Sequence, residues 1–239
     1  MEMGHSFKPS KGLGQNFLTN KKVLETIIKT ADLKPDDLVL EVGPGLGILT
    51  FELAKHCKVV AVEKDQRISL DIKNVEFIHG DALKIPLPFR DYKVVANIPY
   101  YITSPLIRRF LEADKKPKEM VLLVQKEVAQ RICAKPPKMN ILAISVQLYA
   151  KPEIITYVSK SSFKPSPKVD SAVIKISGIK NPNIDTDKFF KIIKAGFSHP
   201  RKKISNNLSL DLIKKTSIDP ARRAGTLSID EWKSLLLNY

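Results

Sequence analysis

The sequence predicts an α/β fold in which an open, seven-stranded sheet is followed by a small helical domain. Three observations lead to this prediction. Short apolar runs alternate with amphipathic helical segments over residues 1–178, several of these runs end on polar residues, and strand patterns stop after Gly178. Such alternation is typical of sheets whose faces are covered by helices. A length of 239 residues allows one such domain and a second, smaller one.

The chain carries a large positive charge. It has 40 Lys and Arg against 25 Asp and Glu, a formal net charge of +15. An excess of this size indicates a polyanionic partner, most often nucleic acid, although a solvated basic surface is the alternative. The two cysteines and four histidines are scattered, so we expect neither a disulfide nor a metal site. No apolar run approaches the roughly 18 residues of a membrane span, and we expect a cytoplasmic protein.

Residues 1–20 predict an irregular, basic arm, because they combine lysines with glycines and lack an apolar periodicity. Asn20 can cap the helix that follows. The apolar face of that helix is formed by Leu24, Ile27, Ile28 and Ala31.

A glycine loop follows the first predicted strand. Leu38–Val42 runs directly into Gly43-Pro44-Gly45-Leu46-Gly47, and a helix is predicted from Ile48. Glycines allow a tight turn and a close approach to a ligand, while the start of a helix offers free amide donors. The next strand, 58–62, ends at Glu63, about twenty residues after the loop, where an acidic side chain binds ribose hydroxyls.

Two further predicted strands also end on polar residues. One spans residues 75–79 and leads to Asp81 and Ala82, and the other spans 93–97 and ends at Asn97. Because the carboxyl ends of parallel strands lie at one edge of a sheet, we expect these residues to meet there around a ligand. Each acid alone is more often a solvated loop residue, and it is their common placement that favours a site.

The stretch Asn97-Ile98-Pro99-Tyr100 suits an adenine amino group. The amide of Asn97 offers donors and an acceptor, Pro99 fixes the backbone and withholds an amide donor, and Tyr100 presents a flat ring. Phe163 lies in a proline-rich turn. We therefore expect both Tyr100 and Phe163 at the mouth of a pocket, although a pair of core aromatics is the alternative.

The rest of the first domain continues the alternation. A helix is predicted to begin at Ser104-Pro105, since proline fits the first turn of a helix, and the last two strands are expected to form an antiparallel edge. The predicted elements are a strand at Glu119–Gln125, helices at Lys126–Ile132 and Met139–Leu148, and strands at Ile154–Val158 and Ala172–Ile176.

Residues 179–239 predict a small, basic, helical domain. From Lys180 onward there are 12 Lys and Arg against 6 Asp and Glu. Ser228 and Glu231 have the spacing of a capping box ahead of a last helix. The basic clusters, read as candidate RNA contacts or alternatively as a solvated face, are Arg201, Lys202, Lys203, Arg222 and Arg223.

Five motifs together resemble the rRNA adenine dimethyltransferases of the KsgA type, and the similarity runs from the arm to the last helix. The resemblance implies a Rossmann-like class I methyltransferase domain over 1–178, including the arm, and an RNA-binding domain over 179–239. The motifs are Lys11–Leu18, Leu40–Gly47, Gly80–Ala82, Asn97–Tyr100 and Phe163–Ser171.

The resemblance implies a function. It is the dimethylation of N6 of two adjacent adenosines in a hairpin loop near the 3′ end of small-subunit rRNA, with S-adenosylmethionine as methyl donor, during ribosome biogenesis. The implied partner is the small ribosomal subunit or its precursor, bound by a monomer. Roles in binding the cofactor are implied for Asn16, Leu18, Gly43, Gly45, Glu63, Asp81, Ala82 and Asn97. Catalytic roles are implied for Asn97, Ile98, Pro99, Tyr100 and Phe163, with Tyr100 and Phe163 stacking on the flipped adenine.

Three alternatives remain open at this point. The macrolide-resistance (Erm-type) enzymes, which act on large-subunit RNA, share most of these motifs. A non-catalytic assembly or transcription factor could have the same fold, and DNA adenine methylation is a weaker alternative. The segment 134–140 is shorter than the usual loop of the family, which leaves the details of RNA docking open.

Overall fold

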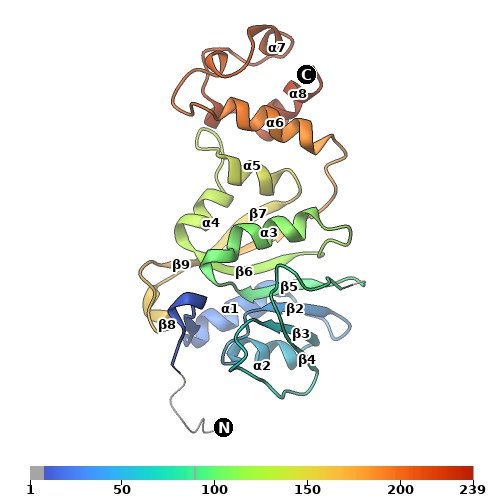
Figure 1. Ribbon diagram of the computed structural model, residues 1–239, viewed down its shortest axis with the longest axis vertical. Coiled ribbons are helices and arrows are strands. Elements are labelled where there is room, and N and C mark those ends of the chain that lie inside the picture. Colours follow the sequence, from blue (N-terminus) through green and yellow to red (C-terminus); the bar gives the residue numbers. More distant parts are fainter. Residues whose placement is uncertain (1–7, 89, 239) are drawn as a thin grey trace. The chain divides into compact units, whose positions relative to one another are not determined.

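The computed structural model describes residues 8–88 and 90–238. Within them, seven strands form one sheet in the order β4-β3-β2-β5-β6-β9-β7, and β1 pairs with β8 in a separate two-stranded sheet (Figure 1). This confirms the predicted α/β class and the seven-stranded sheet. The chain packs as two compact units. The first holds the chain up to Ala129 together with Glu153–Ser177, and the second holds Gln130–Pro152 together with the chain from Gly178.

The sheet is parallel except at one side. β5 pairs in parallel with β2 and β6, whereas β9 is antiparallel to β6, with Gln125 opposite Ser171. The antiparallel side was predicted from the sequence. The bounds are β1 Phe17–Leu18, β2 Leu38–Val42, β3 Lys58–Glu63, β4 Val75–His79, β5 Lys93–Asn97, β6 Met120–Gln125, β7 Lys151–Val158, β8 Phe163–Lys164 and β9 Ser171–Ser177.

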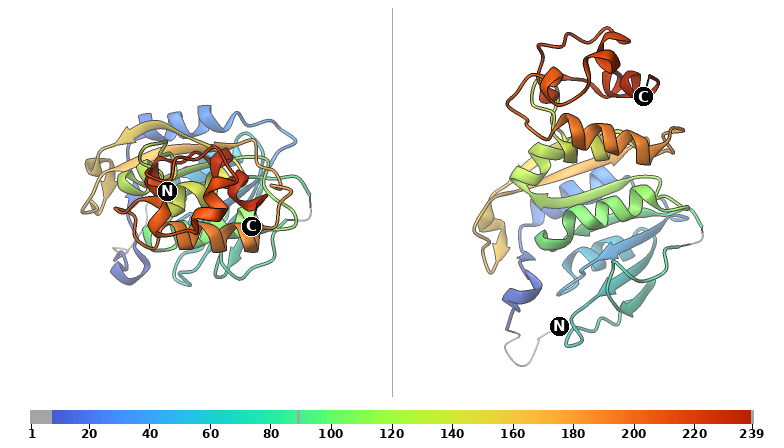
Figure 2. Two further views of the ribbon diagram at one scale, coloured as in Figure 1. Left: turned by 90° about the horizontal axis from the view of Figure 1, so that it is seen from above. Right: turned by 45° about the horizontal axis from the view of Figure 1, so that its top comes forward.

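The central strands are buried because helices cover the sheet. In β5 every residue except Asn97 is buried, and in β6 every residue except Gln125. Continuous burial explains why these strands read as unbroken apolar runs in the sequence. α1 lies along one face of the sheet and is drawn in blue in Figure 2. The helices of this part of the chain are α1 Lys21–Ala31, α2 Ile48–Ala54, α3 Thr103–Glu112 and α4 Lys126–Ile132.

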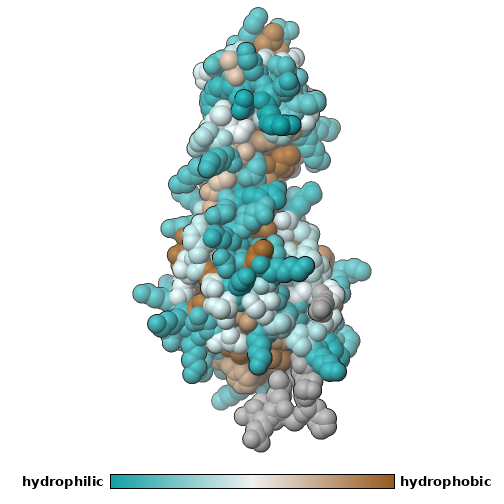
Figure 3. Space-filling view, turned by 90° about the vertical axis from the view of Figure 1, so that its left-hand side faces the viewer, coloured by the Kyte–Doolittle hydropathy of each residue, from teal (hydrophilic) through white to brown (hydrophobic). Residues whose placement is uncertain are grey.

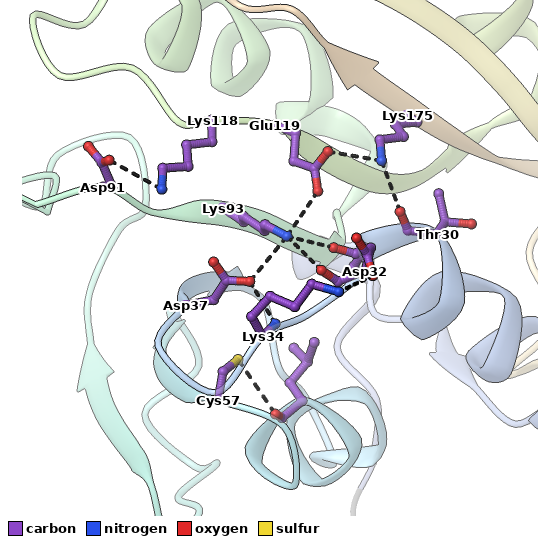
Figure 4. A network of polar contacts seen from close by, with 12 residues as sticks. Thr30, Asp32, Lys34, Asp37, Cys57, Asp91, Lys93, Lys118, Glu119 and Lys175 are labelled. Atoms are coloured by element: carbon purple, nitrogen blue, oxygen red, sulfur yellow. Dashed lines mark hydrogen bonds and ion pairs between the residues drawn. The ribbon is translucent and has the colours of Figure 1, made fainter.

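Lys93 anchors the start of β5 in a buried polar network (Figure 4). Its ammonium donates to the carbonyls of Ala31 and Asp32, each at 2.9 Å. It also forms ion pairs with Asp37 at 3.1 Å and Glu119 at 3.2 Å. Burial opposes its charge, but the two carboxylates outweigh this and raise the pKa of Lys93. The network therefore ties β5 to the end of α1 and to the start of β6.

Apart from the start of β7, the regular elements of the second unit are helices, which irregular segments connect. α6 and α8 pack around Trp232, whose ring stacks on Phe197 with centroids 5.6 Å apart. The predicted capping box of Ser228 and Glu231 is present at α8. α5 begins at Ile141, two residues later than predicted, because the Asn140 side chain caps it. The helices are α5 Ile141–Gln147, α6 Thr186–Gly196, α7 Leu210–Lys214 and α8 Ile229–Leu236.

Residues 130–152 group with the C-terminal helices, which a division at residue 178 does not anticipate. The amide of Met139 donates to the carbonyl of Gly225 at 2.9 Å, so the short segment 134–140 packs within the second unit.

Figure 3 shows a mostly hydrophilic face with small, separate hydrophobic areas. Among the described residues, no helix has the length and apolar character needed to cross a membrane.

Candidate active site

A cavity at the carboxyl ends of β2, β3, β4 and β5 brings together most of the residues that were predicted to form a site. It has about 930 Å³ of empty space, part of it open to solvent. The predicted residues that line it are Asn16, Leu18, Gly43, Gly45, Glu63, Asp81, Ala82, Asn97, Ile98, Pro99 and Tyr100.

The glycine loop after β2 needs its glycines. Gly43 and Gly45 have φ angles of 70° and 54°, a region that other residues rarely adopt. A Cβ on Gly45 would lie 2.7 Å from the ring of Phe17, and one on Gly43 would lie 3.3 Å from Pro99. The loop is thus packed between the arm on one side and the Asn97–Tyr100 segment on the other.

Glu63, the last residue of β3, is buried, and backbone amides hold its carboxylate. One oxygen accepts from Gly45 at 3.2 Å, and the other accepts from Asp65 at 2.8 Å. A carboxylate has about four acceptor positions. Glu63 can therefore still accept hydrogen bonds from two adjacent hydroxyls of a ligand in the cavity.

Asp81, after β4, is held as a carboxylate. The Leu83 amide donates to one oxygen at 3.0 Å, and the Lys64 ammonium donates to the other at 3.0 Å. These two hydrogen bonds, that of Leu83 first, lower the pKa of Asp81. Arg109 of α3 donates to the carbonyl of Ala82, which fixes the same loop from the other side. The loop therefore presents a rigid acceptor.

Asn97 has a defined amide orientation. Its Nδ2 donates to the backbone carbonyl of Asn16 at 3.1 Å. A carbonyl can only accept, so the nitrogen of the amide must face it. The Oδ1 atom is thereby left to accept a hydrogen bond from a ligand.

Glu41 in β2 was missed by the sequence prediction. Its side chain is 1% exposed and lines the cavity, and its Oε2 has no hydrogen-bond partner among the described residues. Burial raises the pKa of Glu41 to about 8; the nearby Thr50 hydroxyl opposes this shift, and Glu63 adds to it. A charged residue inside an otherwise apolar strand was the signal that could have identified it.

Gln15 and Asp65 were also missed. The Gln15 amide donates to the buried carboxylate of Asp65 at 2.8 Å and accepts from the Ser10 amide at 2.7 Å. Arg67 binds the same carboxylate and holds the pKa of Asp65 well below its usual range. We call the Gln15–Asp65 hydrogen bond the arm latch. Because the Asp65 amide donates to Glu63, the arm latch connects the arm to the acid at the end of β3.

The two aromatic residues have different environments. Tyr100 is half-buried and borders the cavity, as expected. Phe163 is 4% exposed and belongs to the hydrophobic core, because β8 pairs with β1 and places Phe163 opposite Leu18. The expectation that Phe163 lies at a pocket mouth is therefore wrong for this structure. Tyr101, which is 51% exposed and also lines the cavity, was not predicted.

The five basic residues that were predicted to contact RNA also differ from one another. Arg201, Lys202, Lys203 and Arg223 are exposed, and Lys203 and Arg223 form a β-bridge. We call these four the basic patch. Arg222 is only partly exposed, and its guanidinium donates to the carboxylate of Glu231 and lowers the pKa of that group. Arg222 thus supports the capping box of α8, and the four residues of the patch remain candidates for contacts with phosphates.

The comparisons with known proteins agree with one another. A family profile described as "Ribosomal RNA adenine dimethylase" matches residues 6–239. The "Ribosomal RNA small subunit methyltransferase A" of Dehalococcoides mccartyi strain BAV1 is 45% identical, covering 100% of this chain and 91% of the relative. The protein of the same name from Alkaliphilus metalliredigens is 39% identical, covering 97% of this chain and 92% of the relative.

Two solved structures are similar over nearly the whole chain. A dimethyladenosine transferase from Plasmodium falciparum has a TM-score of 0.80 and 30% identity, covering 92% of this chain and 96% of that one. The 23S rRNA methyltransferase ErmE has a TM-score of 0.77 and 25% identity, with coverages of 93% and 99%. The alignment to the Dehalococcoides protein spans 269 positions for the 239 residues here, so that relative carries insertions that this chain lacks.

Proposed function

Because this chain belongs to the ribosomal RNA adenine dimethylase family, and is thus an rRNA adenine dimethyltransferase, we propose the following reaction for it. It transfers methyl groups from S-adenosylmethionine to N6 of two adjacent adenosines, in a hairpin loop near the 3′ end of small-subunit rRNA. The relatives named for the small subunit, at 37–46% identity, favour this RNA over the large-subunit RNA of the Erm-type alternative.

The orientation of the Asn97 amide is the observation that supports this proposal best. With Nδ2 engaged by Asn16, Oδ1 can accept one hydrogen of an adenine amino group. The backbone carbonyl of Ile98, which also lines the cavity, would accept the other. Two acceptors would draw the nitrogen away from planarity, so that its lone pair is no longer delocalised into the ring and points toward the methyl donor. The chain contributes orientation and charge placement, which are effective in a preorganised site.

The cavity fits S-adenosylmethionine in several respects. Two acids line it: Glu63 can accept hydrogen bonds from ribose hydroxyls, and Asp81 can accept one from an adenine amino group. The buried Oε2 of Glu41, which has no partner among the described residues, also calls for a polar ligand. When bound, the cofactor supplies a methyl group on a sulfonium centre. The residues that would hold it are Asn16, Leu18, Gly43, Gly45, Glu63, Asp81 and Ala82, with Asn97 between it and the target.

The target adenine would have to leave its stack to reach Asn97. Flipping costs a few kcal/mol, and stacking on an aromatic side chain gives back about 1–3 kcal/mol per base. Tyr100 borders the cavity and can supply one face. Phe163 is buried in the core, so a second face from this residue would require its side chain to move when RNA binds. We therefore assign the first stacking contact to Tyr100.

The basic patch would bind phosphates of the rRNA. The chain would act as a monomer in the cytoplasm on the small ribosomal subunit or its precursor. Support for an RNA-binding role comes from the net charge of +15 and from the exposure of all four patch residues.

A methylation assay tests the proposal. Small subunits from cells that lack this modification would be incubated with the protein and S-adenosylmethionine, with large subunits assayed in parallel. We expect N6,N6-dimethyladenosine, identified by mass, at two adjacent positions near the 3′ end of the small-subunit RNA. Modification of the large-subunit RNA alone would favour the Erm-type reaction, and donor binding by calorimetry without any transfer would favour a non-catalytic factor.

A further inference from the structure

A hydrogen bond outside the cavity holds Tyr100. Its hydroxyl lies 2.8 Å from the hydroxyl of Ser171, a residue at the start of β9 that is 0% exposed. Ser171 does not line the cavity, so it cannot touch a bound base directly. The contact joins a wall of the cavity to the interior of the sheet.

Ser171 is a rigid anchor because of its place in the sheet. β9 pairs with β6 over six consecutive residue pairs, and Ser171 lies opposite Gln125 at the end of this ladder. The next residue of the chain after Gln125 is tied as well, since the Lys126 amide donates to the Asp170 carbonyl at 3.0 Å. The position of the Ser171 hydroxyl is therefore fixed from both sides.

Tyr100, in contrast, sits at the start of a short 3₁₀ turn, Tyr100–Ile102, which has no side-chain cap. The ring has two rotatable torsions, and only its edge is anchored by a hydrogen bond. We propose that Ser171 is a positioning residue, which fixes the plane of the Tyr100 ring so that the ring can stack on the target adenine. This inference rests on the proposed function and adds a residue to it.

The same contact has a consequence for specificity. The Tyr100 hydroxyl is engaged by Ser171, and burial raises its pKa. The ring therefore presents a face without a polar group for reading the base. Stacking tolerates any base, so the choice of adenine falls on Asn97 and the Ile98 carbonyl, which meet the amino group.

A double-mutant cycle tests the role of Ser171. Ser171→Ala and Tyr100→Phe remove the same hydrogen bond from its two ends, while both keep an aromatic ring at position 100. Each single variant is expected to lower kcat on small-subunit RNA by about 3- to 10-fold, the effect of one net hydrogen bond, with the Kd for S-adenosylmethionine and the Tm close to those of the parent. The double variant is expected to be no worse than either single variant.

Thr103→Val is the matched control. Thr103 is also buried and lies three residues from Tyr100, but its hydroxyl has no hydrogen-bond partner among the described residues, so the activity of this variant should stay near that of the parent. Equal losses from Ser171→Ala in the parent and in the Tyr100→Phe background would overturn the proposal. So would a loss in Ser171→Ala that is matched by a lower Tm and weaker donor binding. Parent protein that methylates no RNA would instead contradict the proposed function.

Discussion

The Nδ2 atom of Asn97 donates a hydrogen bond to the backbone carbonyl of Asn16 at 3.1 Å. This contact joins the carboxyl end of β5 to the N-terminal arm, which lies eighty-one residues earlier in the chain. Asn16 is itself held, since its side-chain Nδ2 atom donates to the Gly14 carbonyl at 3.0 Å. The arm therefore both borders the cavity and orients the side chain that would bind the target.

Removing the Asn97 amide should stop methyl transfer without removing the cofactor. In Asn97→Ala we expect kcat to fall by about 10²–10³, the usual effect of losing one preorganised polar group, with a change of less than about threefold in donor Kd. Asn97→Asp separates the roles of the two amide atoms. It keeps an acceptor for the target but loses the donor to the Asn16 carbonyl. We expect it to be as inactive as the alanine variant. In a single-turnover assay, full activity of Asn97→Ala would contradict the mechanism, and full activity of Asn97→Asp would contradict the role of the Asn16 contact in orienting the acceptor.

The arm latch should control the affinity for the cofactor. Gln15→Ala removes the bond to Asp65, so we expect the Kd for S-adenosylmethionine to rise about 3- to 10-fold. Gln15→Glu places a second carboxylate opposite Asp65 and should weaken binding further. Gln66→Ala, an exposed glutamine beside Asp65, is the control and should leave calorimetric binding unchanged. Parent-like affinity in Gln15→Glu would show that the latch has no such role.

Local signals made most of the fold and the cavity predictable. The alternation of strands and helices, and the polar residues at Glu63, Asp81 and Asn97, can be read within a few residues of sequence. Phe163 could not be placed in this way, because its burial depends on the pairing of β8 with β1, which is distant in the chain. The contact between Gln15 and Asp65 spans fifty residues, and neither side chain stands out locally.

Neighbouring residues of one type can also differ in ways that only the fold decides. Arg222 and Arg223 are adjacent and look equivalent in the sequence. The turn before α8 directs the first toward Glu231 and leaves the second exposed. Pairing of this kind depends on the path of the backbone, which residue type and spacing do not encode.

These two arginines give a matched pair of variants. Arg222→Ala should lower the Tm by roughly 2–5 °C with little change in RNA affinity at a temperature where it is folded. Arg223→Ala should leave the Tm unchanged and weaken RNA binding. Neutralising Arg201, Lys202 and Lys203 together should reduce the slope of log K against log salt by about 0.7–0.9 for each lost phosphate contact. An unchanged slope in filter-binding titrations would remove these residues from the interface.

Lys93 should be important for stability and not for chemistry. Lys93→Met keeps the length of the side chain but leaves Asp37 and Glu119 without the ammonium between them. Breaking a buried ion pair in this way costs about 3–5 kcal/mol, which urea unfolding can measure. Lys175→Met is the control, because Lys175 is more exposed and pairs with one carboxylate, that of Glu119 at 2.9 Å, besides donating to the Thr30 carbonyl at 3.1 Å. We expect Lys175→Met to lower the free energy of unfolding by less than about 1 kcal/mol. Equal losses in the two variants would contradict the prediction that Lys93 is the main stabilising cation of this network.

Glu41 should make the stability of the cofactor-free protein depend on pH. Its pKa is about 8 in the folded chain and 4.5 as the reference value, so between these values the folded state holds a proton that the unfolded state has released. The stabilisation from neutral Glu41 is therefore complete below about pH 4.5 and is lost as the pH rises to 8, by up to about 1.4 kcal/mol per pH unit.

Glu41→Gln cannot ionise. Its unfolding free energy relative to the parent should thus increase from pH 5.5 to pH 8.5 in urea titrations, while the exposed control Glu76→Gln should show no such trend. A constant difference between Glu41→Gln and the parent across this range would mean that Glu41 is already ionised at pH 5.5.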